Sequence, residues 1–183
     1  MNVNPSCEPN TDILIVDDNP YNLRLLSMIL TDHGYEVRKA VSGKMALQSV
    51  KVMPPDLILL DIKMPGMDGY EICETLKNDP TFQYIPIIFI SALDDVVDKV
   101  KAFSVGCVDY ITKPFHQEEV LARVENQIRI QVLNSELEKK NKDLQELNEK
   151  LAASNQRLNE FAHVVSHDLK QPIQGIMGFS NLI

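Results

Sequence analysis

The stretch DLILLD, residues 56–61, places four consecutive apolar residues between two acids. Short runs of this kind are typical of parallel strands that are buried on both faces. Four further β-rich runs occupy residues 12–18 (DILIVDD), 35–41 (YEVRKAV), 85–92 (IPIIFISA) and 108–112 (VDYIT). Amphipathic stretches lie near residues 20–32, 43–53, 69–78 and 94–104, and another begins at Gln117. The alternation predicts an α/β fold of the (βα)5 type, with a parallel sheet covered by helices on both faces.

Composition argues against several functional classes. The 183 residues carry a net charge of −8 and no basic cluster that would neutralise a row of phosphates, so direct nucleic-acid binding is disfavoured. The three cysteines, Cys7, Cys73 and Cys107, have no metal-ligand spacing, which predicts reduced thiols. No signal peptide and no run of about 18 apolar residues is evident. We therefore predict a cytoplasmic protein that binds neither nucleic acid nor a membrane.

After Gln117 the pattern becomes purely helical, with no proline or glycine between Phe115 and Pro172. One heptad position is filled by leucines, at Leu137, Leu144, Leu151 and Leu158. The second position is partly apolar, at Leu133, Leu147 and Phe161, and polar at Lys140 and Ser154. A sustained heptad stripe is typical of a coiled coil, so we predict a long helix that forms a parallel homodimer. A single solvated helix is the alternative.

Polar side chains stand where the predicted strands end. Asp17 and Asp18 end the first strand, and Asp61 ends the third. Ser91 ends the fourth strand, and Lys113 follows the fifth. We expect these groups to converge, because ligands of open parallel sheets bind outside the carboxyl ends of the strands. Clustered carboxylates favour a bound Mg²⁺, and a carboxylate beside a lysine and a hydroxyl can accept a phosphoryl group.

Four motifs at these positions resemble the receiver domain of two-component response regulators. They are VDD at 16–18, LLDIKMPGMDGYE at 59–71, SA at 91–92 and DYITKPF at 109–115. The resemblance implies a doubly wound, flavodoxin-like fold whose parallel sheet has the strand order 2-1-3-4-5.

The same resemblance implies a role for each matched residue. Asp61 is the expected phosphoacceptor, and Lys113 is expected to pair with the phosphoryl group. The expected Mg²⁺ ligands are Asp17, Asp18, Asp61 and the backbone carbonyl of Lys63. Ser91 and Tyr110 are expected to form the conformational switch, and Pro114 to follow a cis peptide bond.

The sequence SHDLKQPI, residues 166–173, resembles the H-box of sensor histidine kinases. This resemblance implies that His167 is a phosphoacceptor and that the neighbouring Asp168 assists it. Asp168 stands where a glutamate is commoner in that family, and Lys170 where an arginine is commoner. Because His167 lies two residues from both Val165 and Leu169, it faces away from the apolar stripe. An ordinary surface histidine is the alternative.

Together these features predict four segments. They are a flexible tail (1–10), a receiver domain (11–130), a signalling coiled-coil linker (131–160) and a truncated first helix of a dimerisation and histidine phosphotransfer domain (161–183). The chain thus resembles the N-terminal part of a hybrid histidine kinase, which is an enzyme. Its ATP-binding domain is expected outside this sequence, so this chain alone should not autophosphorylate with ATP.

Two functions remain open at this point. In the first, phosphorylation of Asp61 regulates the kinase through the dimeric coiled coil, and the partners are phosphodonor or phosphoacceptor two-component proteins. In the second, the chain is a non-enzymatic receiver with a dimerising helix that acts through protein partners, and His167 is incidental.

Overall fold

The structure is a computed structural model that describes residues 11–91 and 102–180, with side chains described as far as residue 162 and at Val165. The chain divides into two units, Met1–Val132 and Leu133–Ile183. The strands are β1 (Asp12–Val16), β2 (Glu36–Ala40), β3 (Leu57–Asp61), β4 (Ile87–Ser91) and β5 (Asp109–Thr112). The helices are α1 (Pro20–Thr31), α2 (Gly43–Val52), α3 (Gly69–Lys77) and α5 (Gln117–Ser180).

The five strands form one parallel sheet in the order β2-β1-β3-β4-β5, which confirms the predicted order. In the register of this sheet, Asp61 stands beside Ile90 and Ser91 beside Thr112. The carboxyl ends of β1, β3, β4 and β5 therefore meet at a single edge. This edge is where the functional side chains are found.

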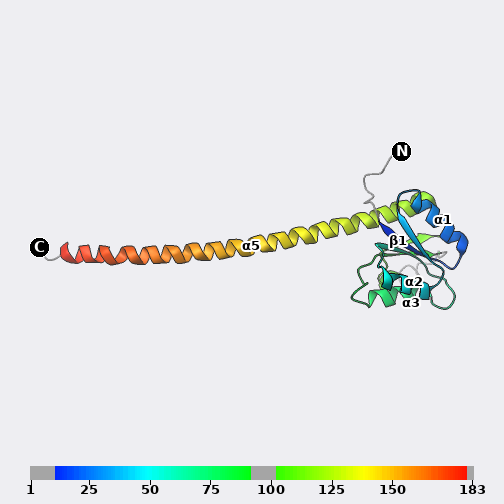
Figure 1. The fold of residues 1–183 in the computed structure, drawn as a ribbon, viewed down its shortest axis with the longest axis horizontal. Coiled ribbons are helices and arrows are strands. Elements are labelled where there is room, and N and C mark those ends of the chain that lie inside the picture. The colour runs from blue at the N-terminus through cyan, green and yellow to red at the C-terminus, as the bar shows by residue number, and fades with distance from the viewer. Residues whose placement is uncertain (1–10, 92–101, 181–183) are drawn as a thin grey trace. The chain divides into compact units, whose positions relative to one another are not determined.

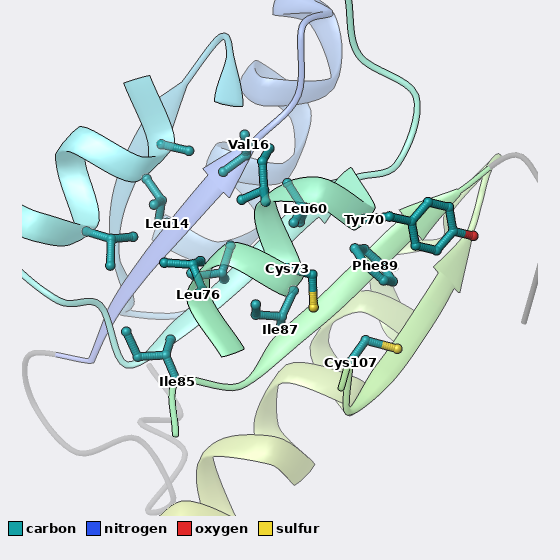
Figure 2. Close-up of a cluster of buried hydrophobic side chains, with 14 of the residues drawn as sticks. Leu14, Val16, Leu60, Tyr70, Cys73, Leu76, Ile85, Ile87, Phe89 and Cys107 are labelled. Atoms are coloured by element: carbon teal, nitrogen blue, oxygen red, sulfur yellow. The ribbon is translucent and has the colours of Figure 1, made fainter. Parts of the chain in front are cut away.

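Strand residues alternate between two apolar clusters, one on each face of the sheet. Leu14, Val16 and Leu60 point to the face covered by α2 and α3, where Phe89 packs edge-on against Tyr70 (Figure 2). Ile13 and Ile15 point to the opposite face, which is covered by α1 and the first turns of α5. Figure 1 shows α1 on the other side of the strands from α2 and α3. Truncating any of these buried leucines or isoleucines to alanine would cost about 2–5 kcal/mol.

Three of the helices begin at side chains that accept hydrogen bonds from the first turn. Asn19 accepts the backbone N–H of Tyr21 at the start of α1, and Ser42 caps α2. Asp68 and Glu71 form a capping box at the start of α3. Such caps satisfy backbone donors that have no partner inside the helix, and they fix where each helix leaves the sheet edge.

Two sequence expectations fall wholly or partly outside the described residues. These are the tail at 1–10 and most of the helix expected near 94–104, of which residues 102–104 are helical. The final helix is longer than the uninterrupted stretch suggested, since α5 continues through Pro172 to Ser180. No described helix is both long enough and apolar enough to span a membrane.

Candidate functional site at the carboxyl edge of the sheet

Three carboxylates gather at the carboxyl edge of the sheet. Asp17 and Asp18 directly follow β1, and Asp61 is the last residue of β3. One oxygen from each lies within 4.8 Å of the others. Asp17 is fully buried and Asp61 is nearly so, whereas Asp18 is exposed. The cluster therefore offers three hard oxygen donors, one of them facing solvent, which is the kind of donor set that Mg²⁺ prefers.

Lys113 brings a positive charge into this carboxylate cluster. Its Nζ lies 2.9 Å from Oδ2 of Asp17 and 3.0 Å from Oδ2 of Asp61. Its backbone N–H donates to the carbonyl of Ser91 at 2.7 Å, so the turn after β5 is fixed to the end of β4. The peptide bond between Lys113 and Pro114 is cis, as the resemblance implied.

Burial dominates the electrostatics of Asp61. Desolvation raises the pKa of its carboxyl group, and the nearby Asp17 charge raises it further. The hydrogen bond and charge of Lys113 and a backbone hydrogen bond with Lys63 lower this pKa, but the net shift is upward. For Lys113, burial alone would lower the pKa, and its hydrogen bonds to both aspartates outweigh burial and raise it. Lys113 therefore remains an ammonium group at neutral pH.

Two asparagines that the sequence analysis did not single out hold Asp17 in place. The side chain of Asn22 donates to Oδ2 of Asp17 at 2.8 Å, and the backbone N–H of Asn19 donates to Oδ1 at 2.8 Å. Asn19 directly precedes Pro20, and that helix-start pattern was readable in the sequence. The contact of Asn22 had no comparable signal, because it depends on the angle at which α1 leaves the edge.

The other residues that the sequence predicted for the functional site lie on different elements of the chain. Ser91 is nearly buried at the end of β4, and Lys63 follows β3 with its backbone hydrogen-bonded to Asp61. Tyr110, in β5, packs its ring edge against Phe103 with centroids 6.0 Å apart. His167 and Asp168 are part of α5 in the second unit, and their side chains lie outside the described part of the chain.

Gly69 lets the chain that follows Asp61 fold tightly back on it. The N–H of Gly69 donates to the carbonyl of Ile62 at 2.9 Å. A Cβ at this position would stand 2.5 Å from the backbone oxygen of Asp61 and 2.8 Å from Cα of Ile62. Both contacts are with backbone, which cannot rotate away as a side chain does.

We therefore expect Gly69→Ala to destabilise the protein by about 1–3 kcal/mol, a typical cost of overpacking. Gly43→Ala is the matched control, because Gly43 is likewise the first residue of its helix. A Cβ there would meet the ends of the Ile72 and Met67 side chains, at 2.8 and 3.0 Å, and these can shift. Urea unfolding of both variants checks the difference. Equal stability losses would contradict this explanation for Gly69.

The strand order and the acidic edge define a flavodoxin-like α/β protein with a charged site at the carboxyl ends of its strands. The response regulator receiver domain family matches residues 13–125. The chain belongs to this family.

Similar proteins include response regulators and a hybrid kinase. Response regulator PleD of Caulobacter vibrioides is 43% identical over 125 residues, which are 68% of this chain and 28% of PleD. Hybrid signal transduction histidine kinase D of Dictyostelium discoideum is 34% identical over 93% of this chain and 13% of its own length. The structure of the NtrX receiver domain from Brucella abortus is 31% identical, with a TM-score of 0.61 over 64% of this chain and 98% of that one. The chain thus spans less than a third of both sequence relatives.

These findings correct one prediction. The enzyme expected from the H-box resemblance, a sensor histidine kinase, is wrong for this chain. The matching family is the receiver domain, and most of the matched relatives are response regulators. The described residues after β5 form a single helix, so they contain no second sheet to build a nucleotide-binding domain.

Receiver domains bind Mg²⁺ at an acidic cluster, and in this chain Asp17, Asp18 and Asp61 form that cluster. The residues present fit the ion in two respects. All three donors are carboxylate oxygens, and the pKa of Asp61 is raised even beside the Lys113 ammonium, so a further cation would favour its charged form.

Proposed function

We propose that this chain receives a phosphoryl group on Asp61 from a two-component partner, in a reaction that requires Mg²⁺. The observation that carries the proposal is the Asp61 carboxylate, held 3.0 Å from the Lys113 ammonium and within 4.8 Å of two further carboxylates. This arrangement pairs a nucleophile with a fixed positive charge beside a set of donors for a divalent cation.

Each residue at the edge has its own role in phosphoryl transfer. An oxygen of Asp61 attacks phosphorus, and the bond from phosphorus to the donor breaks with its electron pair leaving on the donor. The Lys113 ammonium then moves from the carboxylate to the incoming phosphoryl oxygens, and the Ser91 hydroxyl is the proposed second donor to them. Mg²⁺, held by Asp17, Asp18, Asp61 and the proposed carbonyl of Lys63, supplies charge neutralisation when bound.

We further propose that the phosphorylation state is passed on through α5 as a parallel dimer. α5 packs on the sheet with Val120, Val124 and Ile128, all buried. In the second unit the heptad leucines are exposed in the single chain, Leu144 and Leu151 each at 57%. Exposed leucines at heptad spacing favour a second copy as the partner. The similarity to the Dictyostelium kinase over 93% of this chain extends past the receiver and supports a shared arrangement of the two segments.

His167 is proposed as an additional phosphoryl acceptor for a partner of the same signalling class. The support is the match of residues 166–173 to the H-box and the acidic neighbour Asp168, which could take or orient an imidazole proton. His163, four positions earlier in the sequence, is flanked by Ala162 and Val164 and not by an acid, and it is the natural comparison residue.

The raised pKa of Asp61 gives a prediction for the thermal stability of the protein without Mg²⁺. Because the folded pKa of Asp61 is raised, its carboxylate favours folding less than its protonated form does. The protonated Asp61 side chain therefore favours folding below the pKa that this group has in the unfolded chain. This stabilisation is lost as pH rises through the higher pKa of the folded state. At pH 7 in EDTA we therefore expect Asp61→Asn to have a higher Tm than the parent, measured by scanning calorimetry.

Adding Mg²⁺ should reverse that order. The ion should stabilise the parent by RT ln(1 + [Mg²⁺]/Kd), which is about 2.7 kcal/mol at a hundredfold excess over Kd, and stabilise Asp61→Asn much less. Asp18→Asn serves as a comparison in EDTA, because its carboxylate is exposed and neutralising it should change Tm little. A parent whose Tm is the same in EDTA and in Mg²⁺ would refute the metal site.

A further inference from the structure

Arg123, in the second turn of α5, connects that helix to β5 through charged and aromatic contacts. Its Nη1 donates to both carboxylate oxygens of Asp109, at 2.7 and 2.8 Å. Its Nη2 lies 3.0 Å from Oε1 of Glu119, one turn earlier on α5. The guanidinium carbon stands 5.6 Å from the centroid of the Tyr110 ring, within the range of a cation–π contact.

The contacts of Arg123 differ in kind from those of the apolar residues on the same helix. Val120, Val124 and Ile128 attach α5 to the sheet by non-directional burial, which tolerates small shifts. Arg123 is held by ion pairs that its different nitrogens make with Asp109 and Glu119, and by one aromatic face, all of which depend on the orientation of the planar guanidinium. A change in the Tyr110 ring would therefore alter what Arg123 contacts while the apolar packing stayed in place.

We propose that Arg123 is a positioning residue that transmits the state of Tyr110 to α5. The inference rests on the proposed function, in which Asp61 is phosphorylated, and on the expectation from the receiver-domain resemblance that Tyr110 belongs to the conformational switch. When the ring turns away, Arg123 loses its aromatic contact but keeps Asp109 and Glu119. The contacts that attach the first turns of α5 to β5 are therefore altered. Since α5 runs without interruption from Gln117 to Ser180, a change at its start is a change at the base of the dimerising segment.

The test uses hydrogen–deuterium exchange of the full chain, read over residues 117–132. Samples carry Mg²⁺ alone or Mg²⁺ with beryllofluoride, a stable mimic of the phosphoryl group. We expect the mimic to change exchange in this segment by about two- to fivefold in the parent, the effect of one cation–π contact on local opening. Arg123→Gln should remove this difference, because the amide has neither the positive charge nor the several nitrogens with which Arg123 contacts Asp109 and Glu119 together.

Arg129→Gln is the matched control. Arg129 is exposed on the same helix, so this variant makes the same charge change and should keep the full difference. Arg123→Lys should restore part of it, because an ammonium group can still lie over the ring. If Arg123→Gln does not fold, as judged by circular dichroism, Tyr110→Leu provides the second test. It removes the aromatic face, leaves the ion pair with Asp109, and should abolish the difference.

The outcomes separate this inference from the proposed function. Binding of the mimic is read from a shift in Tm, and a parent that shows no shift refutes the proposed function together with this inference. With the mimic bound, a difference that persists in both Arg123→Gln and Tyr110→Leu overturns the role of Arg123 alone. If Arg123 only stabilised the fold, Arg123→Gln would alter exchange by the same factor with and without the mimic. That result would also overturn the proposed role of Arg123.

Discussion

Asp61→Asn is expected to abolish phosphoryl uptake from a small phosphodonor. The parent should gain the mass of one phosphoryl group when Mg²⁺ is present and none in EDTA, as read by intact-protein mass spectrometry. The neutral amide lacks the negatively charged carboxylate oxygen that attacks phosphorus, while the remaining groups at the edge only stabilise charge. The loss should therefore be complete within detection.

Asp56→Asn is the matched control for Asp61→Asn. Asp56 directly precedes the opposite end of the same strand, where its side chain accepts the backbone N–H of Asp12 at 2.8 Å, and an amide oxygen can accept that bond too. Unchanged labelling of Asp61→Asn would remove Asp61 from the proposed role. Label that survives in Asp61→Asn but disappears when His167→Gln is added would identify His167 as an acceptor, and His163→Gln should leave such label in place.

The sequence predicted most of the fold because its strongest signals are local. The apolar runs at 13–16 and 57–60 stand on buried central strands, and the acids that follow them mark the strand ends to within a residue. Burial on both faces makes such runs continuous, so they stand out from the amphipathic helices around them. The strand order did not follow from these runs and came from the resemblance alone.

The features that the sequence did not reveal depend on residues that come close to one another only in the folded structure. Gly69 is required because the backbone of Asp61 passes beside it, although eight positions separate the two in the sequence. Arg123 and Asp109 form their ion pair across two different elements, so neither residue predicts the other. The kinase prediction is wrong for another reason, since an eight-residue motif does not by itself identify a whole enzyme.

Leu144→Lys combined with Leu151→Lys is expected to convert a dimer into a monomer. Both leucines occupy the same heptad position and are 57% exposed in the single chain, so burying them requires a second helix. A buried leucine contributes about 1.5–3 kcal/mol, and a dimer loses four of them in this variant. Because about 1.4 kcal/mol corresponds to a tenfold change, the dimer Kd should rise at least about a hundredfold.

Sedimentation velocity at tens of micromolar, roughly the range suited to a moderate coiled coil, measures this effect. The seam is expected to be moderate because Lys140 and Ser154 interrupt its second apolar position. Gln145→Lys combined with Ala152→Lys is the matched control, since it adds the same charge one residue further along, outside the seam. That control should sediment as the parent does. A monomeric parent, or a Leu144→Lys/Leu151→Lys variant that sediments like a dimeric parent, would show that the leucine stripe does not join two copies. We would then expect the exposed leucine stripe to bind a protein of different sequence, because exposure of an apolar stripe of this length to solvent is unfavourable.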